Sequence, residues 1–292
     1  MKALWAVEPF HQDKKRVKGM HSLLKQFVSK PAHIEVGYIV TRLENELNLA
    51  FDIPYEERFS TYPRKVLKSS LRKAKVIIED KNIHVVDHET FSTTKTVDRF
   101  LLLAKSRGSD LIALYSHARH GFNRFLLGSF AETAIHRSKV SLLLVNPRAN
   151  FSPKVKRIFY ASDFSPSAKK HLKKVMQICK QLKSDLIVFH QAEVIYKWSL
   201  DESNPKIHAY RRKVKQKQSW IEEECKRVGI NSKVIVVSEF TGTTNMIFKN
   251  ATKEKADLIV VSARTGPVAA LMGGSITRQV VRSSKIPVLV LK

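Results

Sequence analysis

The chain has 292 residues, of which 43% are hydrophobic, and this is enough apolar material for two domains with cores of their own. It carries 52 basic and 26 acidic side chains, giving a formal net charge of +26, with a basic excess in both halves. These values argue against a disordered chain, and the lack of an apolar run of about 18–20 residues argues against a membrane-spanning helix.

The first ten residues, MKALWAVEPF, lack the long apolar segment of a signal peptide, so we expect a cytoplasmic protein. Cys179 and Cys225 form no C-x-x-C pair, which predicts free thiols rather than a zinc site or a redox dithiol. The positive charge favours contact with polyanions or anionic membranes, and a basic surface without such a role is an equal alternative.

The first half of the chain alternates short apolar runs with stretches of helical periodicity, which is typical of a parallel sheet covered by helices. The expected strands are 2–7, 33–40, 82–89, 110–116 and 141–147. Helices are expected around 21–28, over 62–79 and over 94–107, with an irregular insertion at 41–61. Residues 149–154 have no apolar periodicity and predict a linker between a first domain, 1–148, and a second, 155–292.

The second half repeats this order of elements after about 147 residues, which indicates a duplicated domain rather than a solenoid. The expected strands are 157–163, 185–190, 231–240, 257–263 and 287–291, and the later helices are 206–228, 243–255 and 274–282. The first helix of this half should begin at Ser165-Pro166, because Ser is a preferred N-cap and Pro suits the first helical turn.

Three segments of the second half resemble the universal stress protein family. They are DFSPSAKKHL after the first strand, DLIVV in the fourth, and a Gly-Ser that opens the last helix before PVLVL. The order of elements extends the resemblance to both halves, in the tandem two-domain type found in bacteria. It implies two α/β domains, each a five-stranded parallel sheet in the order 3-2-1-4-5 with helices on both faces.

The same resemblance has consequences for assembly. Single domains of the family dimerise through the fifth strand, so it implies that SLLLV and PVLVL face each other as an intrachain pseudo-dimer. A homodimer is an alternative, and no protein partner is identified by the sequence.

The resemblance also implies where a nucleotide would bind. ATP-binding members carry Gly-x-x-Gly, nine residues, then Gly-Ser or Gly-Thr after the fourth strand, because glycine lets the backbone approach phosphates closely. Here Tyr115 and Ala118 replace the two glycines in the first half, and Ser262 and Thr265 replace them in the second. We therefore expect no required cofactor, with ATP binding in the second domain as an alternative.

Ligands bind open α/β sheets at the carboxyl ends of the strands, where the strand order reverses. The candidate binding residues are Asp163, Ser262, Thr265, Gly266, Gly274 and Ser275, with Glu8, Ala118, Gly121, Gly128 and Ser129 as weaker first-half counterparts. The serine of each Gly-Ser is expected to cap its helix. The alternative is an anion pocket at that helix start, strengthened by Arg124 or Arg278.

The remaining polar residues do not form an enzyme motif. His117 and His120 lack a third metal ligand nearby in sequence, His84 and His88 are expected to be packing or solvated residues, and no G-x-S-x-G occurs. We therefore predict no catalytic or metal-binding residue, and at most a weak ATPase.

Three functional hypotheses follow from the sequence. The first is a non-catalytic stress-response protein that binds a partner or a small ligand, and the second is an adenine-nucleotide binder. The third is an electrostatic binder of nucleic acid or anionic lipid through the basic segments HLKKVMQICKQLK and RRKVKQKQSW.

Overall fold

The computed structural model describes residues 1–10, 13–41, 61–88, 90–116, 128–149, 151–192, 205–238, 241–262 and 274–292. Its internal contacts divide the chain into two compact units: unit 1 comprises Met1–Lys154 with Ala263–Lys292, and unit 2 comprises Val155–Ser262. Of the helices in the described ranges, none is both long and apolar enough to cross a bilayer.

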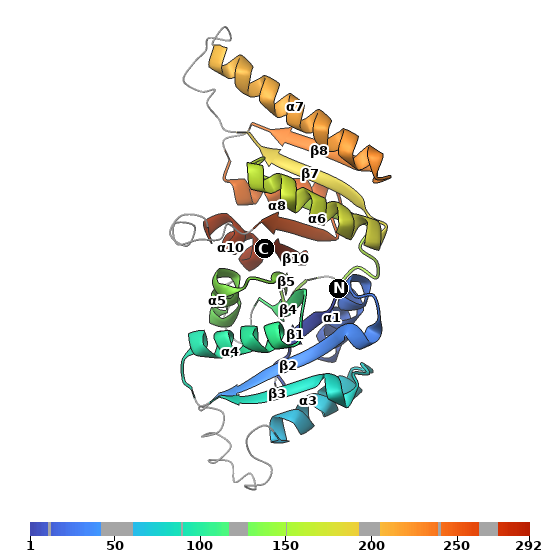
Figure 1. Ribbon diagram of the computed structural model, residues 1–292, viewed down its shortest axis with the longest axis vertical. Coiled ribbons are helices and arrows are strands. Elements are labelled where there is room, and N and C mark those ends of the chain that lie inside the picture. The colour runs from blue at the N-terminus through green and yellow to red at the C-terminus, as the bar shows by residue number, and fades with distance from the viewer. Residues whose placement is uncertain are drawn as a thin grey trace. The chain divides into compact units, whose positions relative to one another are not determined.

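Unit 1 is built on a sheet whose described strands have the order β3-β2-β1-β4-β5-β10 (Figure 1). They are β1 (Ala3–Ala6), β2 (Ile34–Thr41), β3 (Ile83–His88), β4 (Leu111–Tyr115), β5 (Ser141–Val145) and β10 (Val288–Leu291). The first five run parallel to one another, which confirms the α/β prediction and its order 3-2-1-4-5 for the first half of the chain. Strand β2 lies between β3 and β1 and is covered by helices on both faces, which explains its apolar sequence: residues 34–40 are all buried.

The described α-helices of unit 1 are α1 (Lys14–Phe27), α3 (Thr61–Lys73), α4 (Thr93–Ser106), α5 (Ser129–Arg137) and α10 (Gly274–Ser283). Short 3-10 turns at Pro31–His33 and Asp80–Asn82 precede β2 and β3. The right-handed crossovers place α1 and α3 on one face and α4 and α5 on the other, and each pair is in contact. Helix α3 ends six residues before the predicted end, because Lys75 adopts a left-handed conformation with φ of 57°.

Strand β5, whose apolar sequence would be exposed at a sheet edge, pairs antiparallel with β10. Leu289 lies opposite Leu143, and both side chains are buried. The flanking helices are also joined, since the Arg278 guanidinium of α10 lies 2.9 Å from the Glu132 carboxylate of α5. The last helix and strand therefore complete the sheet of unit 1.

Unit 2 has the described strand order β9-β6-β7-β8, and all of these strands are parallel. The strands are β6 (Arg157–Ala161), β7 (Asp185–Gln191), β8 (Ser232–Val237) and β9 (Leu258–Ser262), and the helices are α6 (Pro166–Leu182), α7 (Pro205–Arg227) and α8 (Thr243–Lys253). Right-handed crossovers place α6 and α7 on one face and α8 on the other. Helix α6 begins at Pro166 as predicted, but the Ser165 side chain makes no capping hydrogen bond.

Candidate functional site

The strand order reverses beside the first strand of each unit. In unit 1, β1 lies between β2 and β4, and in unit 2, β6 lies between β7 and β9. The chain leaves the two neighbouring strands in opposite directions at this point, so their carboxyl ends are the expected ligand site.

In unit 1, Tyr115 is the last residue of β4 and therefore lies at the carboxyl end of this strand, beside the strand reversal. Its hydroxyl donates a 2.7 Å hydrogen bond to the carbonyl oxygen of Arg16 in the first turn of α1. Burial raises the pKa of the phenol well above its usual value, so the hydroxyl stays protonated and remains a donor. The side chain at the position expected for the first glycine of a phosphate-binding motif is therefore held by a bond to α1.

The other described first-half candidates make bonds within their own loops. A Glu8 carboxylate oxygen accepts a 3.1 Å hydrogen bond from the Phe10 backbone N–H, and Gly128 N–H donates to Ser116 at 2.8 Å. Gly128 is the N-cap of α5, and Ser129 is the first residue inside the helix. The expectation that Ser129 caps this helix is therefore wrong, because the residue at the cap has no side chain.

In unit 2 the structure brings two of the predicted residues to neighbouring strand ends. Ala161 of β6 is paired with Val261 of β9, so Asp163 and Ser262 follow at the same edge of the sheet. A carboxylate oxygen of Asp163 accepts a 3.0 Å hydrogen bond from the Ser165 N–H, which closes a tight turn before α6. The Ser262 hydroxyl lies 3.2 Å from the Tyr160 hydroxyl.

Several predicted residues cannot be placed in a site. Seven of them lie outside the described residues: Ala118, Gly121, Arg124, Thr265, Gly266, His117 and His120. Gly274 and Ser275 form the first turn of α10, which belongs to unit 1, and the Ser275 side chain lies outside the described part. The Arg278 guanidinium, expected beside an anion pocket, forms the ion pair with Glu132 described above.

The cysteine thiols and the described His, Asp and Glu side chains are the remaining candidates for reactive or metal-binding groups. Cys179 and Cys225 are free and buried, and burial raises the pKa of Cys179 to about 12, which keeps that thiol protonated at neutral pH. Within the described ranges, no group of three or more His, Cys, Asp or Glu side chains could hold a metal ion.

A buried charge cluster around Glu35 was missed by the sequence analysis. The Glu35 side chain is 2% exposed and lies 2.7 Å from Lys2, Arg107 and His84. Burial alone would raise the pKa of this carboxyl, but hydrogen bonds from Arg107, Lys2 and His84 lower it to about 2. Glu35 follows the first residue of β2, at the opposite end of the strands from the ligand edge, so its role is to stabilise the fold.

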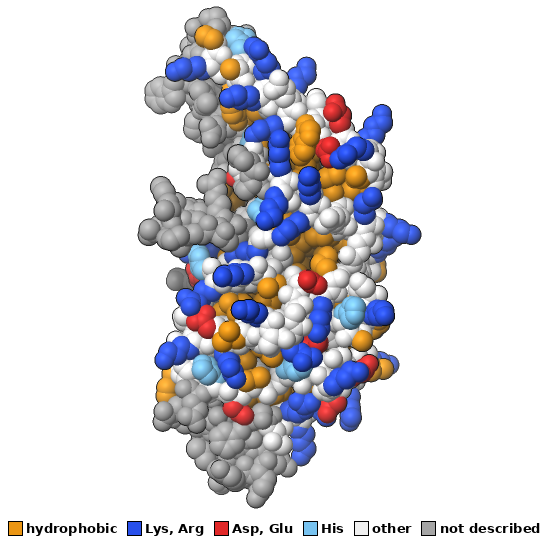
Figure 2. Space-filling model, viewed as in Figure 1, with side chains coloured by type: hydrophobic (Ala, Val, Ile, Leu, Met, Phe, Trp, Pro, Cys, Tyr) orange, Lys and Arg blue, Asp and Glu red, His pale blue; other side chains and the backbone are white. Residues whose placement is uncertain are grey.

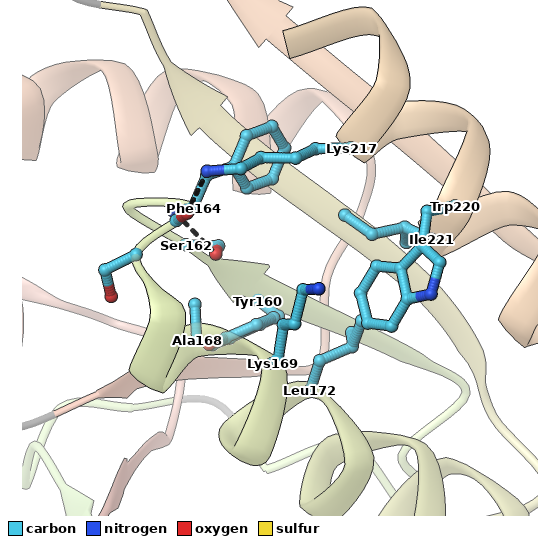
Figure 3. A pocket seen from close by; sticks show the side chains of 10 residues that line it. Tyr160, Ser162, Phe164, Ala168, Lys169, Leu172, Lys217, Trp220 and Ile221 are labelled. Atoms are coloured by element: carbon cyan, nitrogen blue, oxygen red, sulfur yellow. Dashed lines mark hydrogen bonds between the residues drawn. The ribbon is translucent and has the colours of Figure 1, made fainter. Parts of the chain in front are cut away.

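A cavity in unit 2 was also missed. It has a volume of about 240 Å³ and lies between α6 and α7, above the end of β6 (Figure 3). Its lining residues are Tyr160, Ser162, Phe164, Ser165, Ala168, Lys169, Leu172, Lys217, Trp220 and Ile221. The sequence signal was the Trp and Lys pattern of RRKVKQKQSW, but the packing of that helix against α6 could not be deduced from it.

Comparison with known families decides the classification. The sequence matches the universal stress protein family over residues 40–146 and 154–292. The chain belongs to the universal stress protein family. The two matched regions also establish that the family domain occurs twice in tandem in this universal stress protein.

Solved structures of similar fold cover the whole chain. A universal stress protein from Archaeoglobus fulgidus is 20% identical, with a TM-score of 0.66, and the match covers 99% of this chain and 96% of that one. A putative universal stress protein from Pseudomonas aeruginosa is 15% identical, with a TM-score of 0.59 and coverage of 100% and 93%. The search of curated proteins gave no match. At these identities, the structural likeness supports the fold rather than a particular ligand.

Proposed function

We propose that this universal stress protein is a non-catalytic cytoplasmic protein of the stress response that acts by binding a small ligand or a protein partner. Membership in the family supports the stress-response role. The observation that carries the proposal is the hydrogen bond from Tyr115 to α1, because it fixes a phenol side chain at the end of β4, beside the strand reversal where a nucleotide would be expected in unit 1. Ligand binding is therefore assigned to unit 2, where the corresponding strand ends in Ser262.

ATP binding by the second domain is the alternative that the residues of unit 2 favour. Asp163 is retained after β6, and Ser262 adds only a hydroxymethyl group at the end of β9. A carboxylate at this position could bind ribose hydroxyls, and a hydroxyl could donate to a phosphate. We expect at most weak ATP hydrolysis at this edge of the sheet, because the sequence carries no nucleophile motif such as G-x-S-x-G.

Nucleotide stoichiometry tests this assignment. Native mass spectrometry and calorimetric titration with MgATP should show at most a single equivalent bound per chain, and Asp163→Ala should remove it. Two equivalents in the unmodified protein, or full retention by Asp163→Ala, would contradict the proposal. Tyr115→Phe is the matched control: it keeps the ring, should admit no nucleotide, and should lower the free energy of unfolding by about 1 kcal/mol through the lost hydrogen bond.

Electrostatic binding to a polyanion or an anionic membrane is a second candidate function. Helix α6 carries five lysines and no acidic residue: Lys169, Lys170, Lys173, Lys174 and Lys180. Helix α7, on the same face of the sheet, adds exposed Arg211, Arg212, Lys213 and Lys215. Figure 2 shows Lys and Arg side chains spread along these helices. Such a face attracts phosphate groups without reading a sequence.

Salt dependence tests this second candidate. Affinity for a short DNA duplex or for phosphatidylserine vesicles should fall by about 100-fold or more between 50 and 200 mM salt if roughly five phosphates are contacted. Replacing Arg211, Arg212 and Lys213 by glutamine should reduce both the affinity and its salt slope. The same change at Lys73, Lys105 and Lys139, which are exposed on unit 1, is the control for net charge. Salt-independent binding, or equal effects of the two triple variants, would remove this candidate.

A further inference from the structure

We propose that the cavity between α6 and α7 binds a small amphipathic anion, with an apolar chain between the helices and a carboxylate at Lys169 and Lys217. A medium-chain carboxylate is the class that fits. This inference rests on the proposed ligand-binding function and names the ligand class. It is independent of the nucleotide alternative, because the two are tested with different ligands and different residues.

The walls of the cavity are apolar and come from three elements (Figure 3). Helix α6 contributes Ala168 and Leu172, helix α7 contributes Trp220 and Ile221, and Tyr160 of β6 forms the floor. The side chains of residues i, i+2 and i+4 of a strand share one face, so Tyr160 and Ser162 both point toward these helices. Leu172, Ile221 and Tyr160 are only 3%, 4% and 1% exposed, and together they give the cavity a largely apolar wall suited to an alkyl chain.

Two lysines border this apolar space. The ammonium of Lys169 lies 5.0 Å from the centre of the Trp220 ring, and that of Lys217 lies 5.7 Å from the centre of the Phe164 ring. The described lining residues include no Asp or Glu, so among them no carboxylate offsets these two charges. Cationic groups beside an apolar chamber match a ligand with one anionic head and one apolar body.

The loop between β6 and α6 shapes the cavity through an unusual backbone. Phe164 has φ of 54°, a left-handed conformation that a bulky residue seldom adopts. Its carbonyl oxygen accepts a hydrogen bond from the Lys217 ammonium, and its ring stacks on His190 with centres 4.0 Å apart. Strained residues that are held in place by several contacts are common at ligand sites. Lys217 therefore holds the Phe164 loop and faces the cavity at once.

The size and charge of the cavity select among ligands. A volume of about 240 Å³ suits a chain of moderate length and is below the usual range for drug-sized ligands. A neutral alkyl alcohol would gain the apolar contacts without the ion pairs. A triphosphate would bring several negative charges to a cavity whose described lining offers two lysines as cationic groups.

Decanoate below its micellar concentration is the probe, with decanol as its uncharged analogue. Calorimetry on the full chain should show a single equivalent of decanoate. The binding should perturb tryptophan emission, and this response should be missing in Trp220→Phe. Lys169→Met and Lys217→Met should each weaken decanoate binding by about tenfold, and Lys169→Met, which leaves the Phe164 loop untouched, should change decanol affinity by less than about twofold. Ala168→Phe should abolish binding of both ligands by filling the cavity.

Lys173→Met is the matched control, because Lys173 is exposed on α6 one turn beyond Lys169 and does not line the cavity. It should leave decanoate affinity unchanged, and circular dichroism should show all variants folded. The proposal is overturned if decanoate does not bind, or if Lys173→Met weakens binding as much as Lys169→Met and Lys217→Met. Binding to anionic vesicles without binding of monomeric decanoate would also overturn it and would indicate a membrane surface instead.

Discussion

Glutamine in place of Glu35 should lower the free energy of unfolding by about 3 kcal/mol. The carboxylate is 2% exposed and receives hydrogen bonds from Arg107, Lys2 and His84, so its removal leaves three basic groups facing a neutral amide. A similar value follows from the fall of the Glu35 pKa from 4.5 to about 2, since each pKa unit is worth about 1.4 kcal/mol. Urea denaturation of both proteins at pH 7 measures the difference.

The pH dependence of this effect distinguishes a buried charge cluster from simple loss of packing. A carboxyl whose pKa is lowered by folding stabilises the protein above its ordinary pKa of 4.5, and the contribution is lost as the pH falls toward 2. The two proteins should therefore converge in stability between pH 4.5 and pH 2. Asp98→Asn is the control: its ion pair with Arg137 is 39% exposed on the Asp side, so it should cost less than about 1 kcal/mol. A constant difference at all pH values would contradict the assignment.

The fold was predictable because the hydrophobic periodicity and the turn residues between segments indicate the same order of strands and helices. Apolar runs such as DLIALY, alternating with segments of helical periodicity, predicted a parallel sheet, and the structure has strands at those places. Helix ends were less accurate: the helix predicted over 62–79 included the segment AKVIIE after Lys73, but the left-handed turn at Lys75 is a local conformation that periodicity does not report.

The candidate site was only partly predictable. Asp163 and Ser262 come together because parallel strands end at a common edge, and this could be deduced from element order alone. The cavity between α6 and α7 depends on how closely two helices pack, and the Glu35 cluster joins Lys2, His84 and Arg107, which are far apart in sequence. A glutamate inside the apolar stretch HIEVGYIV was the signal for that cluster, since a buried charge requires partners.

Replacing Leu289 by aspartate should lower the stability of unit 1 by about 4 kcal/mol or more, because the new carboxylate would be buried without a partner. Leu289 is 1% exposed and lies opposite Leu143 in the antiparallel pair of β10 and β5. Separation of these strands would uncover Leu142, Leu143 and Leu144 along an open edge, which favours aggregation. Hydrogen exchange of the amides of residues 142–144 should therefore become faster, and size-exclusion chromatography should show larger species.

Ile276→Asp provides the matched control for this result, since it places the same charge on α10, in the helix that precedes β10. Ile276 is 42% exposed, so its carboxylate would remain hydrated and should cost less than about 1 kcal/mol. If β10 stabilises unit 1 by covering β5, the two variants must differ both in stability and in the exchange rates of β5. Equal stabilities of the two variants would mean that β10 contributes little to the stability of unit 1. Unchanged protection of residues 142–144 in Leu289→Asp would mean that β5 keeps its amides protected without β10.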